Sequence, residues 1–257
     1  MAKIYSENKK IDDAVIYFEI CASGLLAENF DNVFADGKFT APADNVIVFL
    51  HGNSEDGATF AKTVDDLCEK YYCIVPDTRG HGKSTAGNSE FTIDLLAEDL
   101  SKLCDELNLG HFKLIGFSDG ANIALTYTVR HPERPSTLIV AGANINPRGL
   151  NTRFLINTKI KCFFAKQNMH KNEKAKLKYG LLSLMADHPH INPRLLKNIT
   201  CPVLVMDAER DLIKKSHTDL IAASIQNPKR VTVPDSTHDV FFSNPDFTIS
   251  AIKEFLS

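Results

Sequence analysis

A serine between two glycines, where a strand pattern gives way to a helix pattern, most limits what this chain can fold into. The pentapeptide Gly116-Phe117-Ser118-Asp119-Gly120 follows the short apolar run Lys113-Leu114-Ile115 and precedes a helical pattern that begins at Ala121. A serine on so sharp a turn points its hydroxyl out of the sheet, at the N-terminal end of a helix. The flanking glycines leave the room that the turn needs. The arrangement predicts a nucleophilic serine.

A serine hydroxyl needs a histidine to accept its proton and a carboxylate to hold that histidine in the right tautomer. His238 lies in a small polar loop after the apolar run Arg230–Pro234, and Asp211 lies in a short loop after an earlier strand pattern. Each of these loops can reach the edge of a sheet where a nucleophile would stand. We predict Ser118, Asp211 and His238 as the catalytic residues, with Asp207 as the alternative acid.

The developing oxyanion of such a reaction needs hydrogen-bond donors. One is expected to be the backbone N–H of Asp119, directly after the serine. The other is expected from the loop His51-Gly52-Asn53, which follows the strand pattern Val46–Leu50, and we choose the backbone N–H of Asn53. His51 is expected to order this loop through a ring hydrogen bond.

With these residues placed, the chain resembles the α/β-hydrolase superfamily, in its single-domain form with a small cap. The resemblance runs from about residue 46 to the C-terminus and rests on four stretches. They are His51-Gly52-Asn53, Asp77–Ser84, Gly116–Gly120 and the loops that carry Asp211 and His238. The resemblance implies an active site at the carboxyl ends of parallel strands, with no cofactor. The order serine, acid, histidine also agrees with that family.

Strand and helix patterns alternate from about residue 46 onward, which is typical of a mostly parallel sheet with helices on both faces. The alternation predicts an α/β fold with residues 1–257 as one domain, and the resemblance implies that it is the α/β-hydrolase fold. Predicted strands are Ala14–Cys21, Val46–Leu50, Tyr72–Pro76, Phe112–Ile115, Thr137–Ala141, Val203–Asp207 and Arg230–Pro234. Predicted helices are Phe60–Lys70, Thr92–Leu107, Ala121–Arg130, Ser216–Ile225 and Phe247–Leu256.

The alternation breaks over about residues 144–199, where the resemblance implies a cap insertion with helices around Arg153–Asn168 and Glu173–Ala186. This stretch holds 11 Lys and Arg against 2 acidic residues, whereas the rest of the chain holds 18 basic and 30 acidic residues. One interpretation is a solvated outer face of the cap helices. The other is a basic field that draws anionic substrates toward Ser118.

Composition and short motifs exclude several other functions. The chain has no apolar run that could span a bilayer and no apolar stretch near Met1 like that of a signal peptide, which favours a cytoplasmic enzyme. Its six cysteines include no C-x-x-C pair and are expected to be buried thiols. His188-Pro189-His190 lacks the spacing and the third ligand of a metal site, so no metal is predicted. No nucleic-acid or membrane partner is expected.

The predicted function is hydrolysis of a small-molecule carboxylic ester through an acyl-enzyme intermediate. The substrate is expected to be ester-like, with an anionic substrate as one alternative, and no substrate-binding residue or oligomeric state is predicted. The same triad also serves thioesterases, acyltransferases, aminopeptidases and C–C bond hydrolases. A non-catalytic ligand sensor on the same fold is the alternative from another class of protein.

Overall fold

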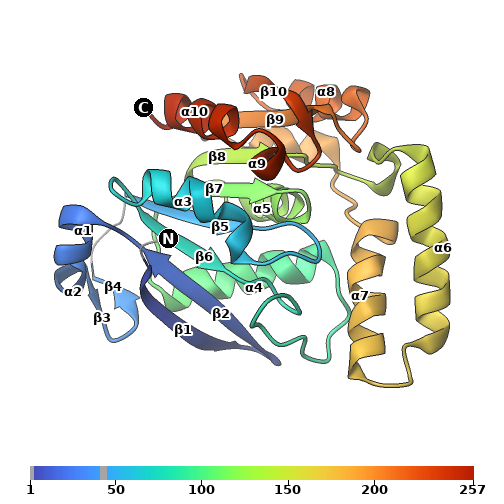
Figure 1. Cartoon of the computed structure of the whole chain (residues 1–257), viewed down its shortest axis with the longest axis horizontal. Coiled ribbons are helices and arrows are strands. Elements are labelled where there is room, and N and C mark those ends of the chain that lie inside the picture. Colours follow the sequence, from blue (N-terminus) through green and yellow to red (C-terminus); the bar gives the residue numbers. More distant parts are fainter. Residues whose placement is uncertain (1–2, 41–44) are drawn as a thin grey trace.

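The computed structural model describes residues 3–40 and 45–257, and its centre is a twisted sheet (Figure 1). The strands of this sheet are β1 (Lys3–Ile11), β2 (Ala14–Cys21), β5 (Val46–Leu50), β6 (Tyr72–Pro76), β7 (Phe112–Phe117), β8 (Pro135–Ala141), β9 (Val203–Arg210) and β10 (Lys229–Thr237). They form an eight-stranded sheet in the order β1-β2-β6-β5-β7-β8-β9-β10. The pairs β1–β2 and β2–β6 are antiparallel and the others are parallel. Two short strands, β3 (Phe34–Ala35) and β4 (Lys38–Phe39), pair separately.

Helices cover both faces of the sheet (Figure 1). They are α1 (Gly24–Glu28), α2 (Phe30–Val33), α3 (Ala61–Leu67), α4 (Ile93–Glu106), α5 (Asp119–Arg130), α6 (Thr152–Asn168), α7 (Glu173–Asp187), α8 (Lys215–Ser224), α9 (Val240–Ser243) and α10 (Pro245–Leu256). Short 3₁₀ turns lie at Gly57–Phe60, Pro147–Gly149 and Pro193–Asn198. Among the described residues, no helix is long and apolar enough to cross a membrane.

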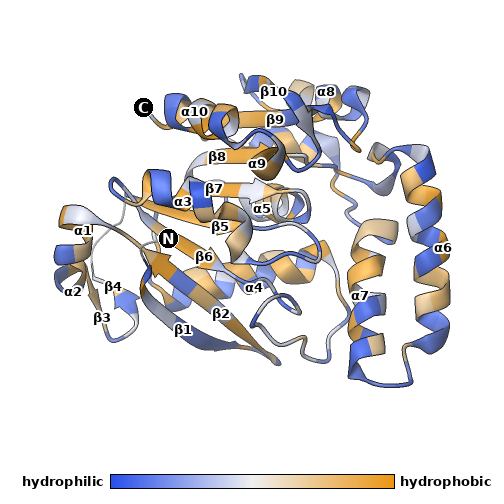
Figure 2. Cartoon of the chain, viewed as in Figure 1, coloured by the Kyte–Doolittle hydropathy of each residue, from blue (hydrophilic) through white to orange (hydrophobic). Residues whose placement is uncertain are grey.

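The core lies in two layers, one on each face of the sheet, and β5 contributes to both. Val46, Val48 and Leu50 belong to the cluster that includes residues of α4 and α5. Ile47 and Phe49 belong to the cluster that includes residues of α3 and α10. Successive side chains of a strand point to opposite faces, so a central strand covered on both sides is apolar throughout. Figure 2 shows the central strands as mostly hydrophobic.

The prediction of a mostly parallel sheet between helices is confirmed, and the strands at Val46–Leu50 and Tyr72–Pro76 have the predicted bounds. The strand β1 was not predicted. Its sequence is largely polar and its side chains are mostly exposed or half-buried, because it pairs only with β2 at the edge of the sheet. An edge strand that faces solvent carries little of the apolar alternation from which strands are predicted.

The expectation of a loop around His238 is partly wrong, because β10 continues to Thr237 instead of ending at Pro234. The pairing of β10 with β9 shifts register between Val233 and Thr237. Asp235 has a φ of 49°, which allows the backbone to bulge there. Because a bulge redirects the end of a strand, β10 remains paired up to Thr237 and leads directly into His238.

The helices α6 and α7 lie between β8 and β9 in the chain and stand side by side at one end of the molecule (Figure 1). They fall inside the predicted insertion, over the helical ranges expected from the sequence. Asn151 and Asn172 accept hydrogen bonds from the first-turn N–H groups of α6 and α7, respectively. Such capping satisfies donors that the helix itself leaves open. We call residues 144–199 the cap segment.

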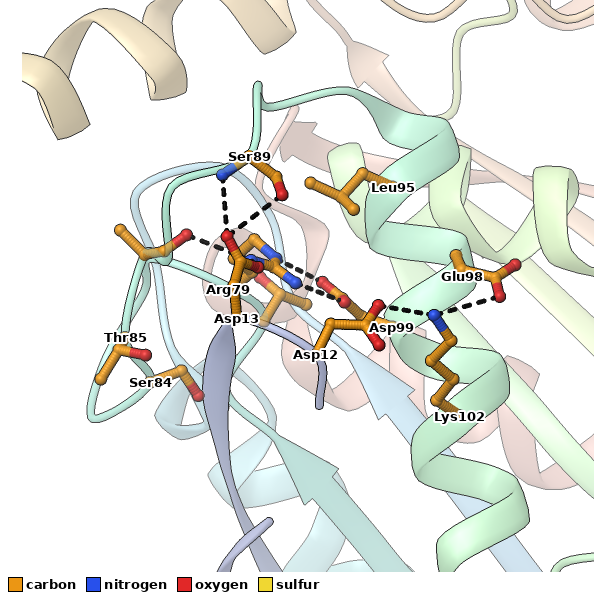
Figure 3. Close-up of polar contacts among 12 residues, drawn as sticks. Asp12, Asp13, Arg79, Ser84, Thr85, Ser89, Leu95, Glu98, Asp99 and Lys102 are labelled. Carbon is orange, nitrogen blue, oxygen red and sulfur yellow. Dashed lines mark hydrogen bonds and ion pairs between the residues drawn. The ribbon is translucent and has the colours of Figure 1, made fainter. Parts of the chain in front are cut away.

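A buried arginine fixes the loop that follows β6. The Arg79 side chain is 0% exposed and makes two 2.7 Å hydrogen bonds to the carboxylate of Asp99 on α4. It also pairs with Asp13, in the β1–β2 turn, at 2.5 Å (Figure 3). Asp77 holds the same loop through the backbone N–H groups of Gly57 and Lys83. Asp77 and Arg79 therefore both anchor this loop.

Replacing one partner of this buried ion pair should destabilise the protein. Burial raises the pKa of Asp99, because it disfavours the charged carboxylate. The close contact with Arg79 opposes this effect and stabilises the charge. We expect Asp99→Asn to lower the free energy of unfolding by about 3 kcal/mol, because it leaves a buried guanidinium undercompensated. Urea unfolding measures this change. The control is Asp94→Asn, on the same helix but 61% exposed, which should cost less than about 1 kcal/mol. Equal effects would contradict the argument.

Candidate active site

The turn between β7 and α5 holds Ser118 in a left-handed conformation, with a φ of 52°. The two flanking glycines are required by packing. A Cβ on Gly116 would lie 2.4 Å from the carbonyl oxygen of Gly120, and one on Gly120 would lie 1.9 Å from that of Leu50. Atoms cannot approach so closely, so any other residue would push the turn away from β5. The serine is therefore displayed at a point where two strands and a helix meet.

The structure brings the three predicted catalytic side chains together in one hydrogen-bonded row. Ser118 Oγ lies 2.9 Å from Nε2 of His238, and Nδ1 of His238 lies 2.6 Å from Oδ1 of Asp211. The side chains of His238 and Asp211 are 16% and 5% exposed. With Asp211 accepting from Nδ1–H, Nε2 is left to accept the serine proton.

Asp211 is fixed by the backbone around it. Its Oδ2 accepts a 3.0 Å hydrogen bond from the N–H of Ala208, and its Oδ1 accepts one of 2.9 Å from Ile213. These bonds hold the carboxylate at the end of β9, where it faces β10. Backbone donors restrict its rotation, so His238 meets an acceptor that is already oriented.

Asp207, the alternative acid, points into a different set of contacts. Its carboxylate pairs with Arg230 at 2.9 Å and accepts a 2.8 Å hydrogen bond from Thr232. Both partners belong to β10. Residues 207 and 211 stand at the same strand end in sequence, but only Asp211 lies beside the histidine.

The loop after β5 is held by a buried histidine. His51 is 1% exposed, its Nδ1 lies 2.8 Å from the carbonyl of Gly52, and its Nε2 accepts from the N–H of Thr78 at 3.0 Å. These partners require the tautomer with the proton on Nδ1. Burial lowers the pKa of His51, which keeps the ring neutral. The ring hydrogen bond expected from the sequence is present.

The side chain of Asn53 joins three parts of the site, a role that the sequence did not reveal. Its amide donates to Oδ2 of Asp119 and to the carbonyl of Leu181 on α7, each at 2.9 Å. The loop after β5, the residue after the nucleophile and the cap segment are thus connected by one side chain. Asn53 and Asp119 line the same cavity as Ser118.

The cavity over Ser118 has a volume of about 480 Å³. Its walls come from the ends of the strands and from the cap segment. The lining residues are Asn53, Glu55, Phe117, Ser118, Asp119, Asn144, Leu150, Phe154, Met185, Arg210, Leu212, Thr237, His238 and Asp239. Phe154 and Met185 of the cap segment could not be assigned from the sequence, because helical periodicity does not say which helix face meets the site. For Arg210, the only indication in the sequence that it lines the cavity is its position next to Asp211.

Three carboxyl groups, those of Glu55, Asp119 and Asp239, lie in the wall of this cavity. Burial raises the pKa of each. Glu55 is held by the N–H of Gly52 at 3.1 Å and by the hydroxyl of Thr59 at 2.9 Å. The wall of the cavity around Ser118 therefore holds these three carboxyl groups together with Arg210, whereas basic residues predominate in the cap segment.

Within residues 3–40 and 45–257, no group of three or more His, Cys, Asp or Glu side chains is arranged to hold a metal ion. The rings of His188 and His190 lie 5.8 Å apart. Burial and the neighbouring His190 lower the pKa of His188.

Comparison with known proteins identifies the fold. A family model described as the alpha/beta hydrolase fold matches residues 45–164. A putative esterase/lipase of Haemophilus influenzae is 26% identical over 239 residues, which cover 82% of this chain and 83% of that protein. The magnesium-chelatase 30 kDa subunit of Rhodobacter capsulatus is 44% identical over 96 residues, 36% of this chain. That match spans only 34% of the relative's length.

The likeness of fold extends over nearly the whole chain. The structure of a thermophilic esterase from Thermogutta terrifontis superposes with a TM-score of 0.72 and 21% identity, covering 98% of both chains. The match includes the sheet and its helices, and the family model includes the serine turn. The chain has the α/β-hydrolase fold and, by its similarity to these relatives, is a hydrolase.

Proposed function

We propose that this hydrolase cleaves small carboxylic esters through an acyl-enzyme intermediate on Ser118. The observation that carries the proposal is the unbroken row Ser118–His238–Asp211, which ends at a cavity large enough for a small molecule. Each member has a neighbour at hydrogen-bonding distance, as the reaction requires.

The first half of the reaction forms the acyl-enzyme. Ser118 Oγ attacks the ester carbonyl carbon while Nε2 of His238 takes the serine proton. The carbonyl electron pair moves onto oxygen, where the backbone N–H groups of Asn53 and Asp119 donate to it. When the tetrahedral intermediate collapses, the C–O bond to the alcohol breaks and His238 gives its proton to the departing oxygen.

The second half returns the enzyme to its starting state. A water molecule attacks the acyl carbon, and His238 takes one of its protons. The C–O bond to Ser118 then breaks, the proton returns to Ser118 Oγ, and the carboxylic acid leaves. Asp211 keeps Nδ1 protonated throughout and stabilises the imidazolium that forms twice.

The cap segment supports a small substrate. Leu150, Phe154 and Met185 supply apolar surface on the side of the cavity opposite the strand ends. Most small-molecule sites are apolar pockets with a few placed polar groups. The relatives named esterases are consistent with an ester as the bond cleaved.

Removing the nucleophile should abolish turnover without unfolding the protein. We expect Ser118→Ala to lower kcat on p-nitrophenyl esters of graded chain length by at least roughly a thousandfold. The free energy of unfolding should change by less than about 1 kcal/mol. The turn is held by the packing of its glycines and not by the Ser118 side chain, whose hydroxyl contacts His238. Steady-state hydrolysis and urea unfolding measure the two effects. Full activity of the variant would sink the mechanism.

Substitution should distinguish the two candidate acids, Asp211 and Asp207, by their effects on kcat. Asp211→Asn should lower kcat by roughly 10⁴-fold, because an amide can favour the wrong tautomer of His238. Asp207→Asn makes the same replacement of a carboxylate by an amide, at the acid that does not contact His238. It should leave kcat within a few-fold of wild type. A comparable loss of kcat in both variants would contradict the assignment.

The charge of the cap segment makes a prediction about anionic substrates. If its basic side chains steer substrates, kcat/KM for an ester with a carboxylate in its acyl group should fall steeply with added salt. A neutral ester of equal length should respond little. Because steering acts on the encounter between enzyme and substrate, the effect should appear in kcat/KM and not in kcat. Equal salt responses of the two esters would remove the steering hypothesis.

A further inference from the structure

The outer side of α6 carries a continuous row of exposed apolar side chains. Ile156, Ile160, Phe163 and Phe164 are 54%, 52%, 59% and 59% exposed. Their spacing of four, three and one residues places them on one side of a helix. The two phenyl rings touch, with centroids 5.6 Å apart. We call these four residues the α6 stripe.

The four side chains of the α6 stripe are left exposed by the fold. The buried residues of α6 are Thr158, Cys162 and Ala165, on the side that packs against α7 and the rest of the cap segment. The helix is therefore apolar on two sides, of which one is covered. Figure 1 shows α6 at the periphery of the molecule, with α7 between it and the sheet, and Figure 2 shows apolar and polar residues interspersed along it. Large apolar surface left exposed in this way marks an interaction site.

The charges around the α6 stripe select the partner. The helix carries Arg153, Lys159, Lys161 and Lys166 and has no acidic residue between Thr152 and Asn168. All four basic side chains are exposed. A second copy of this chain would bring like charges together. A negatively charged surface would instead be attracted, by about 1 kcal/mol for each basic side chain near an anionic membrane.

The α6 stripe also leads to the candidate active site. Ile156 and Ile160 line an open groove of about 720 Å³, and Phe154 lies at its inner side. Phe154, Arg210 and Leu212 line both this groove and the cavity over Ser118. A surface seated on the stripe would therefore lie at the mouth of a path to the nucleophile.

We propose that the outer face of α6 docks on an anionic phospholipid surface, with the α6 stripe in the acyl boundary and the basic side chains at the headgroups. Helices with an apolar side and flanking Lys and Arg bind membranes in this orientation. The groove then opens toward the lipid, so that an amphiphilic ester could pass from the surface to Ser118. This docking is independent of the proposed chemistry, and it departs from the expectation of no membrane partner.

Flotation with lipid vesicles tests the docking. The full-length protein is mixed with vesicles of phosphatidylcholine alone or with a large fraction of phosphatidylglycerol, at low and high salt. We expect binding to the anionic vesicles, at least roughly tenfold weaker binding to the neutral ones, and a loss on adding salt.

Two sets of variants separate the apolar and the electrostatic contributions. Phe163→Gln combined with Phe164→Gln should weaken binding at least roughly tenfold, while Leu25→Gln, which changes an 81% exposed side chain on α1, should not. Replacing Lys159, Lys161 and Lys166 by Gln should also weaken it. Replacing the exposed Lys10, Lys38 and Lys70 by Gln is the matched control. Hydrolysis of a neutral, water-soluble ester should be the same in all these variants.

Three results would overturn the proposal. One is that the folded protein does not float with anionic vesicles at low salt. Another is that binding is unchanged by the Phe163 and Phe164 substitutions, which would indicate general charge attraction. The third is a dimer in analytical ultracentrifugation that the same substitutions dissociate, which would identify a second copy as the occupant. Failure of the ester hydrolysis itself would leave the vesicle result unaffected, so the two proposals fail separately.

Discussion

The close approach of the serine turn to β5 is the constraint on which the candidate site depends. Gly120 passes so near the carbonyl of Leu50 that a single added methyl group would lie 1.9 Å from it. This contact places Ser118 directly beside the end of β5, where the loop with Asn53 begins. Ser118 and the loop expected to supply an oxyanion donor are therefore positioned by one packing contact between the start of α5 and the end of β5. Their relation does not depend on a flexible segment.

The other two predicted catalytic side chains, those of Asp211 and His238, come from the far half of the sheet and are held in place by other contacts. Asp211 follows β9 and is held by backbone N–H groups, while β10 bulges near Asp235 before it delivers His238. Gly142, with a φ of 63°, leaves room for the imidazole, because a Cβ there would lie 2.7 Å from Cε1 of His238. Rigid strand ends and backbone hydrogen bonds thus set the row of side chains, as efficient proton transfer requires.

Much of this could be predicted from the sequence because the chemistry needs particular residues at strand ends. The serine turn, the order of Ser118, Asp211 and His238, and the central strands all carry local signals of residue type and spacing. The edge strand β1 does not, since both of its faces are largely polar. Contacts between distant segments, such as Arg79 with Asp99 or Asn53 with Leu181, leave no periodic signal at all. For the same reason, the cap residues that close the cavity became evident only from the folded chain.

Covalent labelling with a fluorophosphonate tests the central claim most directly, because the reagent reacts only with an activated serine and needs no knowledge of the substrate. Intact mass and peptide mapping would locate the adduct. The account predicts one phosphonyl group per chain, attached to Ser118, with labelling absent in Ser118→Ala and strongly slowed in His238→Ala. An unlabelled wild-type protein that is fully folded, or an adduct on another residue, would contradict the assignment of Ser118 as a nucleophile activated by His238.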